Sequence, residues 1–161
     1  MSIIHAPDRA TPRLPGPAPR ILLIQAPYYA DVVGGMRQGA ARAFAEAGAT
    51  MDVVDVAGGY ELPAALRMAL VQKASRYDGY LLLGCVVKGE TDHYDFICSA
   101  ISQGVMDIAA ETGAAVGFGL LTVDTIEQAI ARSSDDKHNK GAEAAHATLM
   151  QVGLRRRWGL T

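Results

Sequence analysis

The sequence lacks any apolar run of the roughly 20 residues that a membrane-spanning helix needs. Its first residues also lack the apolar core of a secretory signal peptide. The two cysteines, Cys85 and Cys98, lie thirteen positions apart and form no C-x-x-C pair, which argues against a disulfide framework or a thiolate zinc site. We therefore expect a cytoplasmic protein in which both cysteines are small buried apolar residues.

Aromatic residues are scarce at 6%, and neither charge dominates, since 15 basic residues stand against 17 acidic ones. The net charge of −2 argues against nucleic-acid binding through bulk electrostatics. The one basic run, 155–157, is short, and we interpret it as a solvated helix end. Half of the 161 residues are hydrophobic, which is enough for one packed domain with a core of mostly Ala, Val, Leu and Ile.

Proline is concentrated in residues 1–19, which hold five of the seven prolines. Proline has no amide donor and a fixed φ, so we exclude this segment from helices and central strands. We predict a tail that is either unstructured or docked as an extended arm on a partner subunit. The predicted single domain spans residues 20–158.

Beyond the tail, short apolar runs alternate with segments of helical periodicity. The predicted strands are 20–26, 50–56, 79–87 and 114–121, and the predicted helices are 31–47, 62–75, 92–111, 126–132 and 140–156. Apolar strands that alternate with helices indicate a parallel sheet covered on both faces. We therefore predict a three-layer α/β/α sandwich with a four-stranded parallel sheet. Ligands in such folds bind at the carboxyl ends of the strands, so we expect the chemistry in the loops that follow them.

The loop after the third predicted strand is the richest in functional residue types. From Gly84 to Thr91 it is similar to a P-loop, but Glu90 stands where that motif has lysine, which argues against a nucleoside triphosphate. The free amides before the next helix, together with Lys88 and the Thr91 hydroxyl, can still bind one phosphate. The alternative is that Thr91 or Asp92 only caps the helix.

His93 lies two residues beyond Thr91, at the same end of the predicted sheet. Histidine titrates near neutral pH and is suited to proton transfer, although a purely structural histidine is an equal alternative. His138 and His146 are eight positions apart, which is not the spacing of a metal pair, and no carboxylate completes a ligand set. We therefore assign no metal site.

The other loops carry weaker signals. After the second strand, two glycines permit the close approach of a ligand, and Glu61 can accept hydrogen bonds from sugar-like hydroxyls unless it only complements the helix dipole. Tyr28 places a ring where a flat heterocycle can stack, and Phe118, near the expected end of the fourth strand, is a second ring. Basic partners for phosphate or carbonyl groups follow at Arg132, Lys137 and Lys140.

Four motifs, taken in order, resemble the 6,7-dimethyl-8-ribityllumazine synthase family from about residue 20 to residue 156. They are G-G-Y-E-L-P, G-C-V-V-K-G-E-T-D-H-Y-D, G-F-G-L-L-T-V-D-T-I-E-Q-A-I-A-R and N-K-G-A-E-A-A. The resemblance implies a flavodoxin-like fold and a transferase in the penultimate step of riboflavin biosynthesis. The implied reaction condenses 5-amino-6-(D-ribitylamino)uracil with 3,4-dihydroxy-2-butanone 4-phosphate, releases phosphate and water, and needs no metal or organic cofactor.

The resemblance also assigns roles to residues of the first three loops. It implies that Tyr28 stacks on the pyrimidine and that His93 transfers protons. The other implied contacts are with the ribityl chain (Gly59, Tyr60 and Glu61), the uracil edge (the backbone of Val86 and Val87) and the phosphate (Glu90 and Thr91).

A site shared between subunits is a further implication of the resemblance. Phe118, Arg132 and Lys140 are expected to reach the neighbouring subunit's pocket, with Arg132 on the phosphate. Such a site implies a homo-oligomer built on a ring of five, and pentamers, paired pentamers and sixty-subunit shells all occur in the family. The sequence departs from the family pattern at 27–29, where Pro-Tyr-Tyr replaces Arg-Phe-Asn, and at 133–138, which replaces a glycine-richer stretch.

Two alternatives from other classes stay open on the sequence alone. One is a catalytically weak paralogue of the same fold that binds flavins or lumazines. The other is a flavodoxin-like electron carrier, which would need a phosphate-binding loop after the first strand, and Pro27-Tyr28-Tyr29 is not such a loop. The presence of Thr91, His93 and Arg132 favours an active enzyme.

Overall fold

A computed structural model describes residues 10–72 and 76–160, which form alternating strands and helices. The strands are β1 (Arg20–Gln25), β2 (Thr50–Asp55), β3 (Gly79–Val87) and β4 (Val116–Val123). The helices are α1 (Ala30–Glu46), α2 (Glu61–Val71), α3 (His93–Thr112), α4 (Ile126–Ser133) and α5 (Lys140–Arg157). All strand pairs are parallel, in the order β2-β1-β3-β4. The predicted four-stranded parallel sheet is therefore confirmed.

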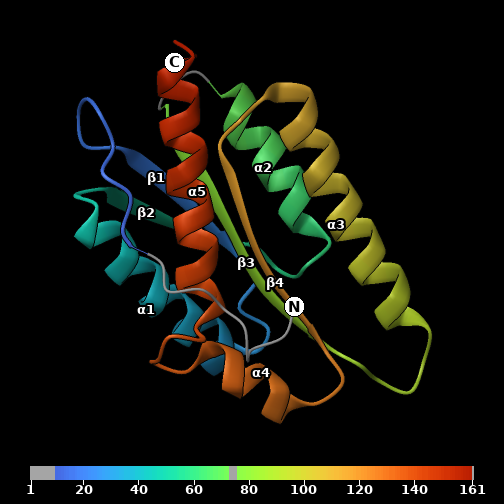
Figure 1. Cartoon of the computed structure of the whole chain (residues 1–161). Helices are drawn as coiled ribbons and strands as arrows, with labels where there is room; N and C mark the ends of the chain where they lie inside the picture. The colour runs from blue at the N-terminus through green and yellow to red at the C-terminus, as the bar shows by residue number, and fades with distance from the viewer. Residues whose placement is uncertain (1–9, 73–75, 161) are drawn as a thin grey trace.

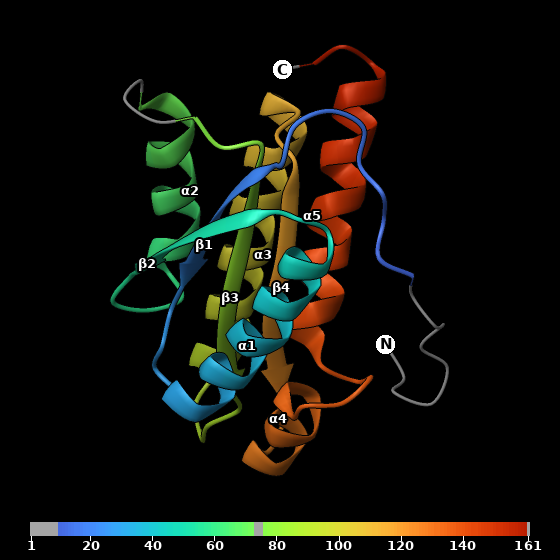
Figure 2. The same cartoon turned by 90° about the vertical axis from the view of Figure 1, so that its left-hand side faces the viewer.

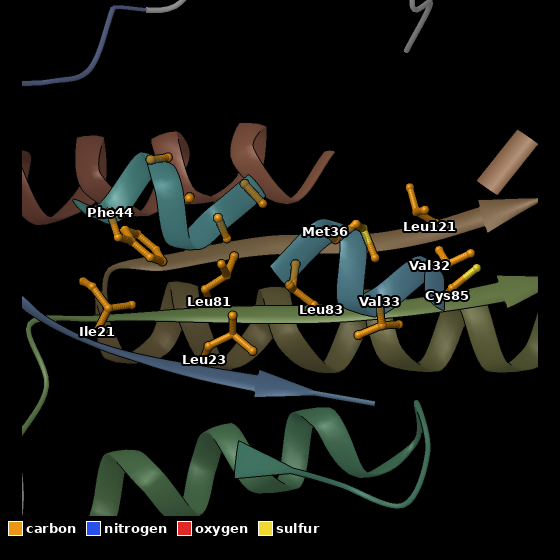
Figure 3. Packing of buried hydrophobic residues seen from close by; sticks show 14 of the residues in the cluster. Ile21, Leu23, Val32, Val33, Met36, Phe44, Leu81, Leu83, Cys85 and Leu121 are labelled. Atoms are coloured by element: carbon orange, nitrogen blue, oxygen red, sulfur yellow. The ribbon is translucent and has the colours of Figure 1, made fainter. Parts of the chain in front are cut away.

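Helices lie on both faces of the sheet, with α1 and α5 on one side and α2 and α3 on the other (Figure 1). Because successive side chains of a strand point to opposite faces, Ile21 and Leu23 join the core under α1 and α5, whereas Leu22 and Ile24 join the core under α2 and α3. Figure 3 shows the first core, with side chains of α1 lying over those of β1 and β3. The predicted three-layer sandwich is confirmed, and its strand order is that of flavodoxin-like folds.

Strand β2 is more exposed than the sequence predicts. It lies at one edge of the sheet and is paired with β1. Five of its six residues are exposed, including Val53 at 40% and Val54 at 47%. The expectation that both faces of every strand are covered is wrong here, because the flanking helices pack mainly over β3 and β4 rather than over β2.

The element ends follow identifiable backbone signals. Gly48 has φ +71 just after α1 ends, a left-handed conformation that glycine adopts without strain. Helix α2 ends at Val71, earlier than predicted, and residues 73–75 of that prediction lie outside the described residues. β4 begins two residues later than predicted, because the turn at Gly113 (φ +62) is followed by a short connection. In the described residues, no helix is long and apolar enough to cross a membrane.

Residues 10–19 have no helix or strand and run along the chain's own helices (Figure 2). Leu14 packs against the core formed with α1 and α5. Arg156 Nη1 donates to the carbonyl oxygens of Pro15 (2.7 Å) and Pro17 (2.9 Å). This part of the tail is therefore held by its own subunit, whereas residues 1–9 lie outside the described residues.

The basic run 155–157 forms the last turn of α5. Arg155 donates to the Gly113 carbonyl, and Arg156 also pairs with Asp78 at 3.3 Å, its side chain only 14% exposed. The interpretation of this run as a solvated helix end is wrong for both residues, because the end of α5 packs against the α3–β4 turn and the tail.

Candidate active site

The structure divides the predicted site residues into two groups. The first, here called the loop group, lies at or just beyond the ends of β1, β2 and β3 and consists of Tyr28, Gly59, Tyr60, Glu61, Val86, Val87, Glu90, Thr91 and His93. The second, here called the pocket group, consists of Phe118 on β4, Arg132 on α4 and Lys140 on α5. Helix α4 lies at the end of the molecule to which the strands point (Figure 2), which is where ligands bind in such folds.

The loop group is open to solvent. Tyr28 is 78% exposed and Tyr60 is 46% exposed, and Glu61, Glu90, Thr91 and His93 are also exposed. The rings of Tyr60 and His93 meet edge to face, with 5.9 Å between their centroids. This contact brings the second and third loops together, so that the predicted ribityl and proton-transfer residues are neighbours.

Local packing explains the glycine that precedes α2. A Cβ atom at Gly59 would lie 2.6 Å from Ile101 Cδ1 of α3, so a side chain there would require either the Ile101 side chain or the second loop to shift. Glu61 follows as the first residue of α2, where its charge also complements the helix dipole. This position is compatible with both predicted roles of Glu61, which are to accept hydrogen bonds from sugar-like hydroxyls and to complement the helix dipole.

The start of α3 shows only weak capping. The backbone amide of His93 donates to Thr91 Oγ1 at the long distance of 3.4 Å, and Asp92, at the cap position, forms no side-chain capping bond. Lys88 Nζ lies 6.0 Å from the centroid of the Tyr94 ring. The free amides at this helix start therefore remain available to an anion.

The pocket group lines a pocket of ≈ 330 Å³ beside β4. Lys140 Nζ lies 2.6 Å from Glu143 Oε2, and both side chains are largely buried, at 14% and 17% exposure. Arg132 Nη1 donates to the Gln128 carbonyl at 2.8 Å. Lys137 is exposed and does not line the pocket. The pocket thus holds two cations and one carboxylate, a combination that favours an anionic, hydrogen-bonding ligand.

The structure corrects two details of the sequence-based site. Phe118 is not near the end of the fourth strand, because β4 continues to Val123 and the Phe118 ring lies against the core under α2 and α3. Glu143 was missed, although its position three residues after Lys140 on one helix face is the spacing of a helical ion pair.

The cysteines are free thiols. Burial, reinforced by the nearby Cys98, raises the pKa of the Cys85 thiol to about 11. Burial, followed by the charge of Asp95, also raises the pKa of Cys98. Since the thiolate is the nucleophilic form, neither cysteine is suited to covalent catalysis near neutral pH. The expected burial is confirmed for Cys85, whereas Cys98 is only half-buried.

The fold and the pocket together define a class: a flavodoxin-like α/β protein with a pocket beside β4, lined by residues of β4, α4 and α5. The family model described as 6,7-dimethyl-8-ribityllumazine synthase matches residues 18–156. The chain therefore belongs to that family, and the resemblance carried by the four motifs is confirmed.

Curated relatives support the same assignment. The chain is 40% identical to the 6,7-dimethyl-8-ribityllumazine synthase of Agrobacterium fabrum, over 88% of this chain and 97% of that protein. It is 41% identical to 6,7-dimethyl-8-ribityllumazine synthase 1 of Rhizobium meliloti, over 86% and 93%. It is 42% identical to 6,7-dimethyl-8-ribityllumazine synthase 1 of Caulobacter vibrioides, over 86% and 92%.

Proposed function

We propose that this protein is a 6,7-dimethyl-8-ribityllumazine synthase, a transferase that condenses ribitylaminouracil with dihydroxybutanone phosphate. The observation that carries the proposal is the match of residues 18–156 to the family. Both parts of the candidate site, from Tyr28 to Lys140, lie inside that match. We further propose that residues 20–158 form the functional domain and act in the cytoplasm, where the free thiols of Cys85 and Cys98 stay reduced.

The loop group is proposed to hold the pyrimidine substrate and to move protons. The exposed ring of Tyr28 can stack on the uracil ring, and Glu61 can accept hydrogen bonds from ribityl hydroxyls. The backbone of Val86 and Val87, half-buried at the end of β3, faces the uracil edge in this proposal. His93, exposed and beside Tyr60, transfers protons in Schiff-base formation, phosphate elimination and ring closure.

The phosphate of the second substrate is proposed to bind between the two groups. Arg132 supplies a planar guanidinium that can donate two hydrogen bonds to phosphate oxygens, and Lys140 adds a second positive charge. Thr91 and the free amides at the start of α3 would complete the phosphate contacts, with the backbone of Glu90.

We propose that each active site forms between two subunits. Most side chains of the loop group are exposed, whereas the pocket group lines a separate pocket that includes none of the loop-group residues. A head-to-tail contact in a closed ring brings the pocket group of one subunit onto the loop group of the next, giving one site per interface. A pentamer or a pentamer-based assembly is the proposed form.

A steady-state assay with both substrates tests this function. The expected result is lumazine formation that saturates in each substrate, and that is slowed about 10²-fold in His93→Ala but kept in Lys137→Ala, because Lys137 lies outside the pocket. Tight binding of a lumazine or flavin without turnover would contradict the proposal and identify a binding paralogue instead.

A further inference from the structure

Asn139 is a buried polar side chain next to the pocket group. It is only 2% exposed. It directly precedes Lys140, and it contacts Ser133, the residue that follows Arg132. A buried amide requires hydrogen-bond partners on both its oxygen and its nitrogen.

Both ends of the Asn139 amide are satisfied. Its Nδ2 donates toward the carbonyl oxygens of Ser133 (3.0 Å), Ser134 (3.0 Å) and Gly35 (3.1 Å). Its Oδ1 accepts from the backbone amide of Ala142 at 3.0 Å and so caps the start of α5. One side chain therefore joins the end of α4, the start of α5 and the middle of α1.

The surface of α1 is shaped to receive this amide. A Cβ atom at Gly39 would collide with the Asn139 side-chain amide, and one at Gly35 would collide with the Ser133 carbonyl oxygen. In contrast, a Cβ atom at Gly34, on the same helix, would meet no atom within 4 Å. Glycine at 39 thus lets Asn139 lie directly on α1, whereas glycine at 34 has no such function.

We propose that Asn139 is a positioning residue that fixes Arg132 relative to Lys140 and so shapes the phosphate-binding part of the site. The inference rests on the proposed function, in which Arg132 binds the substrate phosphate. α4 and α5 have few direct contacts with each other, and the hydrogen bond from Asn139 to the Ser133 carbonyl joins the residue before Lys140 directly to the residue after Arg132. Asn139 itself does not touch the substrate.

The first test is Asn139→Asp in the full-length assembled protein. The aspartate keeps an oxygen to cap α5 but loses the NH₂ donor, and its carboxylate faces three carbonyl oxygens. We expect affinity for inorganic phosphate, measured by calorimetry, to fall about tenfold, the equivalent of one misplaced charge-assisted hydrogen bond. KM for the butanone phosphate should rise equally, whereas KM for ribitylaminouracil should stay within about twofold.

A second, independent pair of variants avoids dependence on the folding of Asn139→Asp. Gly39→Ala should displace the Asn139 amide and weaken phosphate binding in the same way, whereas Gly34→Ala, its matched control on α1, should bind phosphate like the parent protein. If Asn139→Asp does not assemble, the comparison of Gly39→Ala with Gly34→Ala tests the positioning role of Asn139 by itself.

Arg132→Ala is the reference that separates this inference from the proposed function. If it loses phosphate binding while Asn139→Asp and Gly39→Ala keep it, the positioning role alone is overturned. An equal loss of affinity for both substrates would show a general structural role and would also overturn it. If the parent protein does not bind phosphate, or if Arg132→Ala binds it normally, the proposed phosphate site fails and this inference fails with it.

Discussion

The loop group and the pocket group lie at the same end of the sheet but are built by different means. Tyr28, Glu61 and His93 project from strand–helix connections and are exposed. Arg132 and Lys140 are half-buried on helices, and each is held by a hydrogen bond, to Gln128 at 2.8 Å and to Glu143 at 2.6 Å. The loop group is therefore an exposed surface, whereas the pocket group lines a pocket that already exists within one subunit.

This difference supports the proposal that a single subunit holds only parts of a site. The proposed proton carrier, His93, belongs to the exposed surface, whereas the proposed phosphate ligand, Arg132, belongs to the pocket. A condensation that eliminates phosphate needs both at once and needs water kept away from the reacting atoms. An assembly in which the pocket of one subunit covers the loops of the next satisfies both needs.

The largest expected effect is on the loop group. His93→Ala should lower kcat by about 10²-fold, within the usual range for general acid–base catalysis. Because His93 is exposed, the thermal midpoint should stay nearly unchanged. Steady-state rates between about pH 6 and 8, the range in which histidine titrates, provide the measurement. A variant with unchanged kcat throughout that range would remove the proton-transfer role.

The next largest effect is expected in the pocket group, where a substitution should weaken substrate binding. Arg132→Ala should raise KM for the butanone phosphate about 10- to 100-fold, since hydrogen bonds to charged groups contribute about 1.5–3 kcal/mol. Affinity for ribitylaminouracil should change little. Arg132→Lys should recover part of the loss, because an ammonium lacks the planar fork. Equal losses for both substrates would indicate a structural role for Arg132 instead.

A smaller effect, on protein stability, tests whether the pocket group is packed more tightly than the loop group. A Cβ atom at Gly141, beside Lys140, would overlap the Met36 carbonyl oxygen, whereas one at Gly89, in the third loop, meets no atom within 4 Å. Gly141→Ala should therefore lower the free energy of unfolding by about 1–3 kcal/mol, and Gly89→Ala should leave it nearly unchanged. Thermal midpoints at equal protein concentration measure the difference. Similar midpoints for the two variants would contradict the contrast.

Most of the fold could be predicted because its signals are local. The apolar run 79–87 is β3 residue for residue, and helical spacing placed α1 and α5 within one residue of their observed ends. The exposure of β2 could not be predicted in the same way, since the edge of a sheet is set by the order of the strands in space. The partners of Arg155 and Arg156 likewise come from segments distant in the sequence.

The site was predicted as a set of residue types at one end of the sheet, but not as two groups. The positions of the loop group can be predicted from the sequence, because strand ends, glycines and helix starts are local features. Glu143 could have been predicted from the sequence, since its spacing from Lys140 is that of a helical ion pair. Asn139 could not have been predicted, because its proposed role depends on contact with Gly35, more than one hundred residues away. The proposed roles of the individual residues stay predictions that the variants above test.

The most direct test of the shared site is complementation between two inactive variants. One chain carries Glu61→Ala with His93→Ala, and the other carries Phe118→Ala with Arg132→Ala. Different affinity tags permit isolation of rings that contain both chains, and mass spectrometry verifies their composition. Rings formed by each variant alone serve as controls.

If sites form head to tail between subunits, about a quarter of the interfaces in a random equal mixture join two native halves, and about a quarter of the parent activity should return. If each site lies within one subunit, every site lacks two groups. Mixed rings as inactive as either variant alone would then contradict the shared site.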